Sequence, residues 1–114
     1  MIEIMVFRED TEIMGFEVSG HAESDEYGRD IVCASVSVLA QTAVNALGEL
    51  TGIDFEYDVS EGYLRCLVPR KLPPNEKQRV ATIMKTIYVG YESVAESYPD
   101  YVNIRVRRCD DYDD

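Results

Sequence analysis

Residues 31–50 read IVCASVSVLAQTAVNALGEL, and this stretch decides the fold. Val32, Leu39, Ala46 and Leu50 stand at helical spacing, so we predict a helix over 31–50. Nearly all sides of this helix are small or apolar, which is typical of a helix buried in a core. Asp30 stands where a helix N-cap is expected, and Thr51-Gly52 closes the helix.

Strand patterns flank this helix on both sides. Residues 2–18 alternate around a polar run at 8–12, and residues 53–68 alternate around Ser60-Glu61-Gly62, so each stretch predicts a β-hairpin. The spacing of apolar residues predicts an amphipathic helix over 76–98 with Asn75 as its N-cap. Residues 101–107 alternate as a last strand, and the chain ends in CDDYDD, whose acidic residues 110–114 form a tail that we expect to fray.

The predicted elements follow the order ββαββαβ. This order predicts an α+β fold, a two-layer α/β sandwich in which a mainly antiparallel sheet carries both helices on one face. The length of 114 residues suits a single domain, residues 1–114, with one core.

The charge is strongly negative and unevenly spread. The chain has 22 acidic and 11 basic residues, and residues 1–64 hold 14 of the acids and only 2 bases. This charge disfavours general nucleic-acid binding and binding to anionic membranes. It suits either a solvated surface that keeps the protein soluble or attraction of a basic partner. A local basic patch that touches RNA is the minor alternative, built from Arg65, Arg70, Lys71, Lys77, Arg79 and Lys85.

We expect a cytoplasmic protein without a membrane segment. No stretch reaches about 18 consecutive apolar residues, and the start MIEIMVFRED does not resemble a signal peptide. Cys33, Cys66 and Cys109 are too few and too far apart for a disulfide framework or a CxxC zinc site. Reduced thiols, no metal site and no cofactor are therefore expected.

Cys33 is the candidate nucleophile. With Asp30 as N-cap it occupies the third helical position, where unpaired N–H groups and the helix dipole favour a thiolate. His21 is the only histidine, and it lies at the end of a strand across a short loop from the same helix start. A cysteine with a histidine base is the minimum set for acyl transfer, although both residues also suit structural roles. Cys66 falls on the core face of a strand, and Cys109 stands beside acids that would make it unreactive.

Residues 20–39, GHAESDEYGRDIVCASVSVL, resemble the signature of the bacterial ribosomal-processing cysteine protease family known as Prp. The shared pattern is Gly-His-Ala, a loop, Gly-x-Asp-Ile-Val-Cys-Ala and then Val-Ser. The resemblance implies that Cys33 is the nucleophile and His21 the general base, with Gly20, Asp30 and Ser37 as supporting or substrate-binding positions. It further implies a homodimer that removes the N-terminal extension of a large-subunit ribosomal protein of the L-twenty-seven type.

Physical reasoning leaves the supporting roles open. Asp30 either caps the helix or orients the His21 ring. Ser37, one turn after Cys33, either lines the cleft and contacts the thiol or bonds to a carbonyl of its own helix. Gly20 permits a sharp turn into the loop and leaves room for an incoming peptide. The loop at 21–32 is a natural clamp for an extended peptide.

Two other functions compete with a peptidase. In a ribosome-associated binding module, the signature residues would only build the turn between strand and helix and would carry out no chemistry. A thiol-transfer protein would use Cys33 alone, but it lacks a resolving cysteine nearby. Cleavage of a peptide that carries the ribosomal protein's extension separates these functions.

Overall fold

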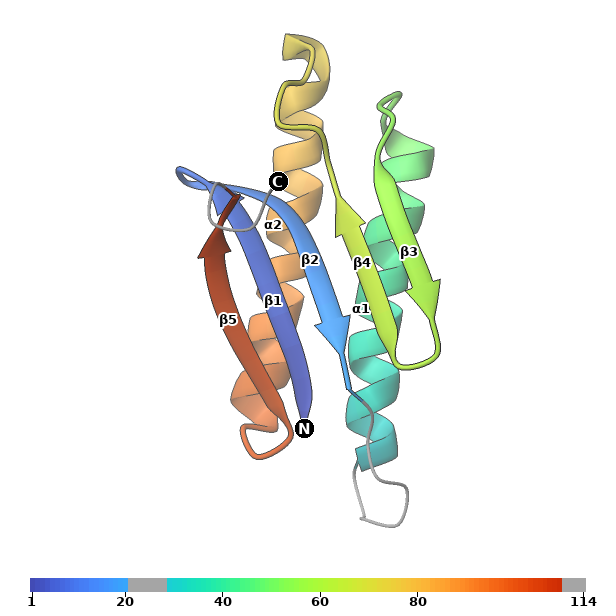
Figure 1. The fold of residues 1–114 in the computed structure, drawn as a ribbon, viewed down its shortest axis with the longest axis vertical. Helices are drawn as coiled ribbons and strands as arrows, with labels where there is room; N and C mark the ends of the chain where they lie inside the picture. Colours follow the sequence, from blue (N-terminus) through green and yellow to red (C-terminus); the bar gives the residue numbers. More distant parts are fainter. Residues whose placement is uncertain (21–28, 110–114) are drawn as a thin grey trace.

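The elements of the chain follow the predicted order. A computed structural model describes residues 1–20 and 29–109, with the backbone alone at 29 and 30. Its strands and helices are β1 (Ile2–Glu9), β2 (Glu12–Ser19), α1 (Arg29–Leu50), β3 (Glu56–Ser60), β4 (Tyr63–Leu67), α2 (Pro74–Ser97) and β5 (Val102–Arg108) (Figure 1). The α+β class and the order ββαββαβ are thereby confirmed.

The strands form one sheet in the order β3-β4-β2-β1-β5. Neighbouring strands are antiparallel except β5, which runs parallel to β1 with Ile2 opposite Val102. Both helices lie behind the sheet in Figure 1, so the predicted two-layer sandwich with a mainly antiparallel sheet is also confirmed. The parallel edge strand is possible because α2 carries the chain back along the sheet before β5 begins.

The core lies between the sheet and the helices. Alternate residues of β1 and β2 are buried, among them Ile4 and Phe16, as the period of two predicts. From α2, Val80, Met84, Ile87 and Tyr91 are buried at intervals of three or four. Phe16 and Tyr91 meet edge to face with ring centres 5.0 Å apart, and this contact joins the two layers.

The first helix is buried on one side only. Val32, Val36, Ala43 and Leu47 face the core, but Val38 is 64% exposed on the opposite side. The prediction of a helix buried all round is therefore wrong, because the sheet covers one side of α1 and α2 packs beside it. Ile31 and Leu50 are exposed as well.

The same helix passes a test of length and composition for a membrane span. The stretch Ile31–Leu50 has a mean hydropathy of 1.6, so by length and composition alone it could cross a membrane. A core helix of a soluble protein passes the same test, and 33% of this stretch is buried inside the fold.

Three boundaries differ from the prediction. α1 begins at Arg29, so Asp30 lies within the first turn and is not the N-cap. α2 begins at Pro74 after Pro73 as N-cap, and Asn75 is its second residue; proline fits there because the first helical N–H groups need no partner within the helix. β3 begins at Glu56 rather than Ile53.

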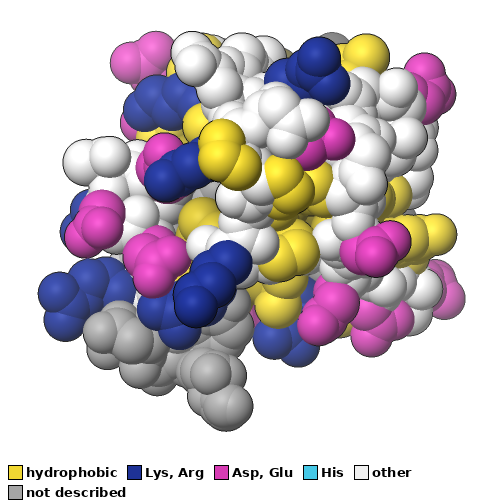
Figure 2. Space-filling model, turned by 90° about the horizontal axis from the view of Figure 1, so that it is seen from above, with side chains coloured by type: hydrophobic (Ala, Val, Ile, Leu, Met, Phe, Trp, Pro, Cys, Tyr) yellow, Lys and Arg dark blue, Asp and Glu magenta, His cyan; other side chains and the backbone are white. Residues whose placement is uncertain are grey.

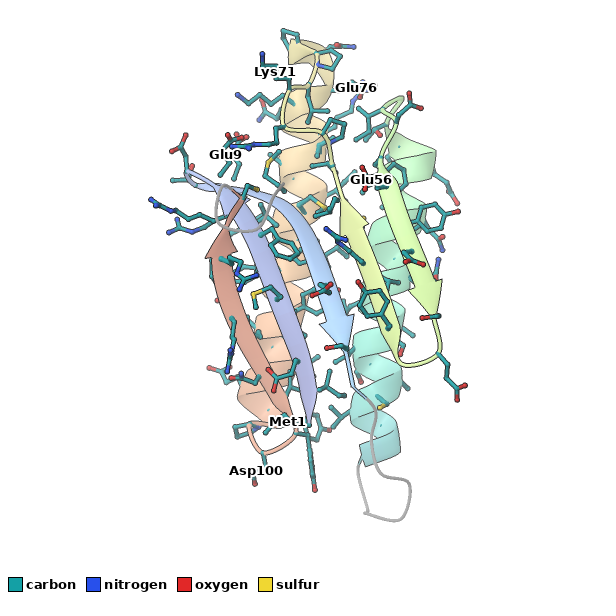
Figure 3. All side chains as sticks on the ribbon, viewed as in Figure 1. Met1, Glu9, Glu56, Lys71, Glu76 and Asp100 are labelled. Atoms are coloured by element: carbon teal, nitrogen blue, oxygen red, sulfur yellow. The ribbon has the colours of Figure 1, made fainter. Side chains whose placement is uncertain are left out.

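The predicted basic patch does not form as one surface. Arg65 lies in β4, whereas Lys77, Arg79 and Lys85 lie on α2 in the other layer. Arg70 pairs with Glu9 at 2.8 Å, so part of this charge is neutralised. Figure 3 places Glu9, Lys71 and Glu76 at one end of the molecule, while Met1 lies at the opposite end, where β2 ends and α1 begins.

Candidate active site

Cys33 lies in the first part of α1, at the end of the molecule where β2 stops (Figure 1). Its side chain is half-buried and packs against the core, so it is accessible on one side. Because α1 begins at Arg29, Cys33 is the fifth helical residue rather than the third. The unpaired N–H groups at the helix start belong to the preceding residues, and the helix dipole acts on the sulfur less strongly than predicted.

Gly20 ends β2 immediately before His21. Its φ of +101° lies in the region that favours glycine, and a Cβ atom there would stand 2.5 Å from the carbonyl oxygen of Met1. This conformation agrees with the need for glycine at residue 20, and the loop predicted to follow it lies outside the described residues. A side chain at residue 20 would collide with the backbone of Met1. This contact accounts for the glycine, so room for an incoming peptide is not needed to explain it.

A cleft opens between α1 and the β3–β4 hairpin. It has a volume of about 150 Å³ and is lined by both Gly20 and Ser37. The hairpin contributes Val59, Ser60 and Tyr63 to its other side. The sequence placed Gly20 and Ser37 in one site, and the structure brings them to one cleft.

Hydrogen bonds hold the hairpin side of this cleft in place. The Gly20 N–H donates to the carbonyl oxygen of Gly62 at 3.1 Å, which ties the hairpin turn to the end of β2. The Tyr63 hydroxyl donates to Glu17 Oε2 at 2.7 Å. Burial, followed by this hydrogen bond to Glu17, raises the pKa of Tyr63 above its ordinary value. The Tyr63 phenol therefore stays protonated, and its hydrogen bond joins β4 to β2 on the sheet face opposite the buried Leu64.

Ser37 is exposed, lies one turn beyond Cys33 on α1 and lines the cleft. The bond to a carbonyl of the same helix is made by Ser35, whose hydroxyl donates to the Ile31 carbonyl at 2.8 Å. Residues four apart are neighbours on a helix, so Ser37 connects Cys33 with the cleft.

The other two thiols are enclosed. Cys66 is fully buried, and burial raises its pKa to about 12, so it is a protonated core residue at neutral pH. Cys109 is 2% exposed and belongs to the core cluster, so the core extends to the residue before the predicted tail. Among the three thiols, Cys33 alone reaches the surface to an intermediate degree.

Part of the predicted site lies outside the described residues. This holds for His21, for the loop up to residue 28, for the side chain of Asp30 and for the tail at 110–114. Residues 29–32 of the clamp predicted over 21–32 belong to α1 instead. Within residues 1–20 and 31–109, no group of three His, Cys, Asp or Glu side chains has the arrangement of a metal site.

Sequence reasoning missed the residues from the hairpin. Val59, Ser60 and Tyr63 stand more than 20 residues from Cys33 in sequence, and their alternating pattern signals a strand but no site. Gln41 also lines the cleft, one helical turn beyond Ser37. Because residues four apart lie on the same face of a helix, the sequence could have predicted this residue from Ser37.

Comparison with known proteins places the chain among cysteine proteases. The family model described as cysteine protease Prp matches residues 1–103. A protein of Bacillus subtilis named ribosomal processing cysteine protease Prp is 35% identical over 109 residues, which cover 93% of this chain and 96% of the relative. A protein of the same name from Staphylococcus aureus is 30% identical and covers 79% of this chain and 83% of its own length.

Solved structures share the fold. A crystal structure from Streptococcus mutans matches with a TM-score of 0.77 at 29% identity, covering 96% of each chain. The S. aureus protease Prp, solved in complex with a substrate peptide, matches with a TM-score of 0.80 at 22% identity, covering 94% of this chain and all of that one.

Proposed function

Because the chain belongs to the cysteine protease Prp family and is a cysteine protease, we propose that it removes the N-terminal extension of a large-subunit ribosomal protein of the L-twenty-seven type. The observation that carries the proposal is a half-buried thiol, Cys33, one helical turn before Ser37, which lines a cleft together with the other signature residue Gly20. We assign the nucleophile to Cys33 and the general base to His21. We also place the protein in the cytoplasm, where its substrate is made.

The dyad performs acyl transfer in two steps. His21 takes the proton of the Cys33 thiol, and the thiolate attacks the carbonyl carbon of the scissile peptide bond. His21 then gives this proton to the leaving amine, which departs and leaves a thioester on Cys33. His21 next deprotonates a water molecule that attacks the thioester, and the returning proton restores the thiol. N–H groups at the start of α1 stabilise the oxyanion.

The supporting residues keep distinct roles in this proposal. Gly20 gives the chain its direction after β2, immediately before His21. Ser37 contacts the substrate from the wall of the cleft. Asp30 is not the N-cap, so orienting the His21 ring is the remaining role from the sequence analysis.

We propose a homodimer whose interface includes the outer face of α1. Val38 and Leu50 are 64% and 60% exposed on this helix, and burial of such side chains by a second copy removes apolar surface from water. Sedimentation equilibrium of the intact protein and of Val38→Glu tests this: a dimer that becomes a monomer supports the interface, and an unchanged dimer contradicts it.

The peptidase proposal is tested with a peptide that carries the ribosomal protein's extension. We expect Cys33→Ala to abolish its cleavage and His21→Ala to slow it by about 100-fold or more. Cys66→Ala is the matched control, because this thiol lies in the core and its loss leaves the chemistry unchanged. Full cleavage by Cys33→Ala or His21→Ala, with an unchanged circular dichroism spectrum, contradicts the dyad and favours the non-catalytic binding module.

A further inference from the structure

We propose that a groove along the outer face of α2 docks the phosphate backbone of single-stranded RNA. The groove has a volume of about 580 Å³ and is lined by residues of α2 at intervals of three and four, from Pro74 to Val89, and by Glu12 of β2. It adds a partner to the proposed peptidase. The choice of RNA among polyanions rests on the proposed function, because a ribosomal protein assembles with RNA, whereas the groove itself is independent of the dyad.

The groove lies on the side of α2 that neither the sheet nor α1 covers. Met84 faces the core, and Gly90 lies against Leu39 of α1. Thr82 and Lys85 line the groove on the remaining side of the helix, and both are exposed. A partner can therefore reach this stripe of α2 without displacing another element.

Residues 70–91 reverse the charge of the rest of the chain. They contain five basic residues and one acidic residue, Glu76, although the whole chain has a net charge of −11. Glu76 is engaged elsewhere, because its Oε2 accepts the Gly52 N–H at 2.7 Å. Within residues 1–20 and 31–109, neither Lys77 nor Lys85 forms an ion pair with a carboxylate. The groove therefore attracts a polyanion locally, while the net charge still disfavours general binding to nucleic acid.

The spacing of the donors suits a strand of linked phosphates. Lys77 and Lys85 are eight residues apart, about 12 Å along the helix, so they fit two phosphates of one strand better than a single anion. Lys85 Nζ lies 5.1 Å from the centre of the Tyr88 ring, which holds the ammonium group beside the groove. Gln78 and Thr82 stand between the two lysines and offer N–H and O–H donors to phosphate oxygens.

The lining also indicates which part of the RNA is bound. None of the described residues that line the groove is aromatic, so the groove offers no surface on which bases could stack. We therefore expect contacts to the backbone and little preference for base sequence.

Docking at this groove leaves the candidate active site open. Figure 3 places Lys71 and Glu76, which flank the start of α2, at the end of the molecule opposite Met1. Cys33 lies on α1 at the Met1 end (Figure 1). No described residue lines both this groove and the cleft beside α1. The protein can therefore hold RNA on α2 and a peptide near Cys33 at the same time.

The experiment measures binding of a fluorescein-labelled oligouridylate RNA by fluorescence anisotropy over a series of salt concentrations. We expect Lys77→Gln and Lys85→Gln together to weaken binding by about tenfold at low salt. The slope of log affinity against log salt should become shallower by about 1.4, since each lost contact to a single strand removes about 0.7. Glu12→Gln removes the one carboxylate among the described lining residues and should strengthen binding by about twofold.

Arg79→Gln is the matched control. Arg79 is exposed on the same helix and carries the same charge, but it lies outside the groove and faces Glu76 at 3.6 Å. We expect Arg79→Gln to weaken RNA binding by less than about twofold and Lys77→Gln alone to weaken it by about threefold. Equal losses would show that net charge and not the groove sets the affinity, which overturns the inference. Absence of RNA binding by the intact protein overturns it as well.

A second ligand and the peptidase assay separate the remaining outcomes. A poly-glutamate peptide of equal charge should bind more weakly than the RNA; equally tight binding that depends on Lys77 and Lys85 would make the groove a site for acidic peptides and overturn the choice of RNA. Cleavage of the extension peptide should be unchanged in the double lysine variant, because the groove is remote from Cys33. A protein that binds RNA without cleaving overturns only the peptidase proposal, and one that cleaves without binding RNA overturns only this inference.

Discussion

The three thiols differ in exposure, and this difference makes a prediction about their reactivity. Cys33 is half-buried at the surface, whereas Cys66 and Cys109 are enclosed in the core. We expect iodoacetamide at neutral pH to alkylate Cys33 first, because a reagent reaches it without unfolding. Mass-spectrometric mapping of the modified peptides measures the order. Faster labelling of Cys109 than of Cys33 contradicts this account.

Because of Cys66, the free energy of unfolding should depend on pH in the alkaline range. Burial raises the pKa of its thiol from 9.0 to about 12 in the folded protein. Between about pH 9 and 12 the unfolded chain loses this proton and the folded chain keeps it, so the free energy of unfolding falls as pH rises. The contribution is at most about 1.4 kcal/mol per pH unit for one group.

The substitution Cys66→Ala isolates that contribution. At pH 7 we expect it to cost on the order of 1 kcal/mol through a small cavity. Above pH 9 the difference from the intact protein should shrink, since the variant has no thiol to ionise. Urea denaturation at several pH values measures this, and a difference that grows with pH refutes the assignment.

At the residue scale, the signature brings Gly20 and Ser37 together, and both line one cleft in the structure. The role of Cys33 as nucleophile stays a prediction. The prediction of Asp30 as N-cap was wrong because the helix starts at Arg29, two residues before the predicted start, and local capping patterns do not fix that boundary. Val59 and Tyr63 enter the cleft through strand pairing, which no local pattern specifies.

At the scale of elements, the approach of β2 to β4 depends on Gly15. A Cβ atom at this residue would stand 2.5 Å from the carbonyl oxygen of Cys66 and 3.2 Å from the Cα atom of Leu67. Backbone atoms cannot move aside cheaply, so we expect Gly15→Ala to destabilise the protein by about 1–3 kcal/mol. Urea denaturation checks the value.

Gly48→Ala is the matched control for this prediction. Gly48 lies exposed in α1, with no atom within 4 Å of a Cβ placed there. Alanine favours a helix over glycine, so the substitution should stabilise the protein by up to about 1 kcal/mol. Equal effects of the two substitutions would show that close packing at Gly15 is not what sets its cost.

Periodicity predicted which segments are helices and strands. It did not predict how deeply each helix is buried or which strands are neighbours. The alternation in β1, β2 and β4 and the spacing in α2 fix strand and helix because side-chain direction follows the backbone period. The burial of α1 was overestimated, since an apolar composition does not reveal that the sheet covers only one side. The parallel pairing of β5 with β1 joins the two ends of the chain and is invisible to local patterns.

At the scale of the whole molecule, the basic side chains are unevenly spread. Figure 2 shows Asp and Glu on both sides of the end view, while Lys and Arg gather mainly toward one side. The net charge of −11 favours encounter with a basic substrate. We expect kcat/KM for a basic extension peptide to fall several-fold as salt rises, because screening acts within about 10 Å at 0.1 M.

A neutral peptide of the same apolar sequence is the control for that salt series. Its kcat/KM should change little, since no long-range attraction is screened. Equal salt dependence for both peptides would mean that the acidic surface serves solubility alone.

The central claim is that Cys33 makes this protein a processing peptidase for a ribosomal protein. Its most direct test is the intact mass of the unprocessed L-twenty-seven type protein after incubation with this protein or with Cys33→Ala. We predict a single loss equal to the N-terminal extension with the intact protein and an unchanged mass with Cys33→Ala. An unchanged mass with both, or the same loss with both, contradicts the claim.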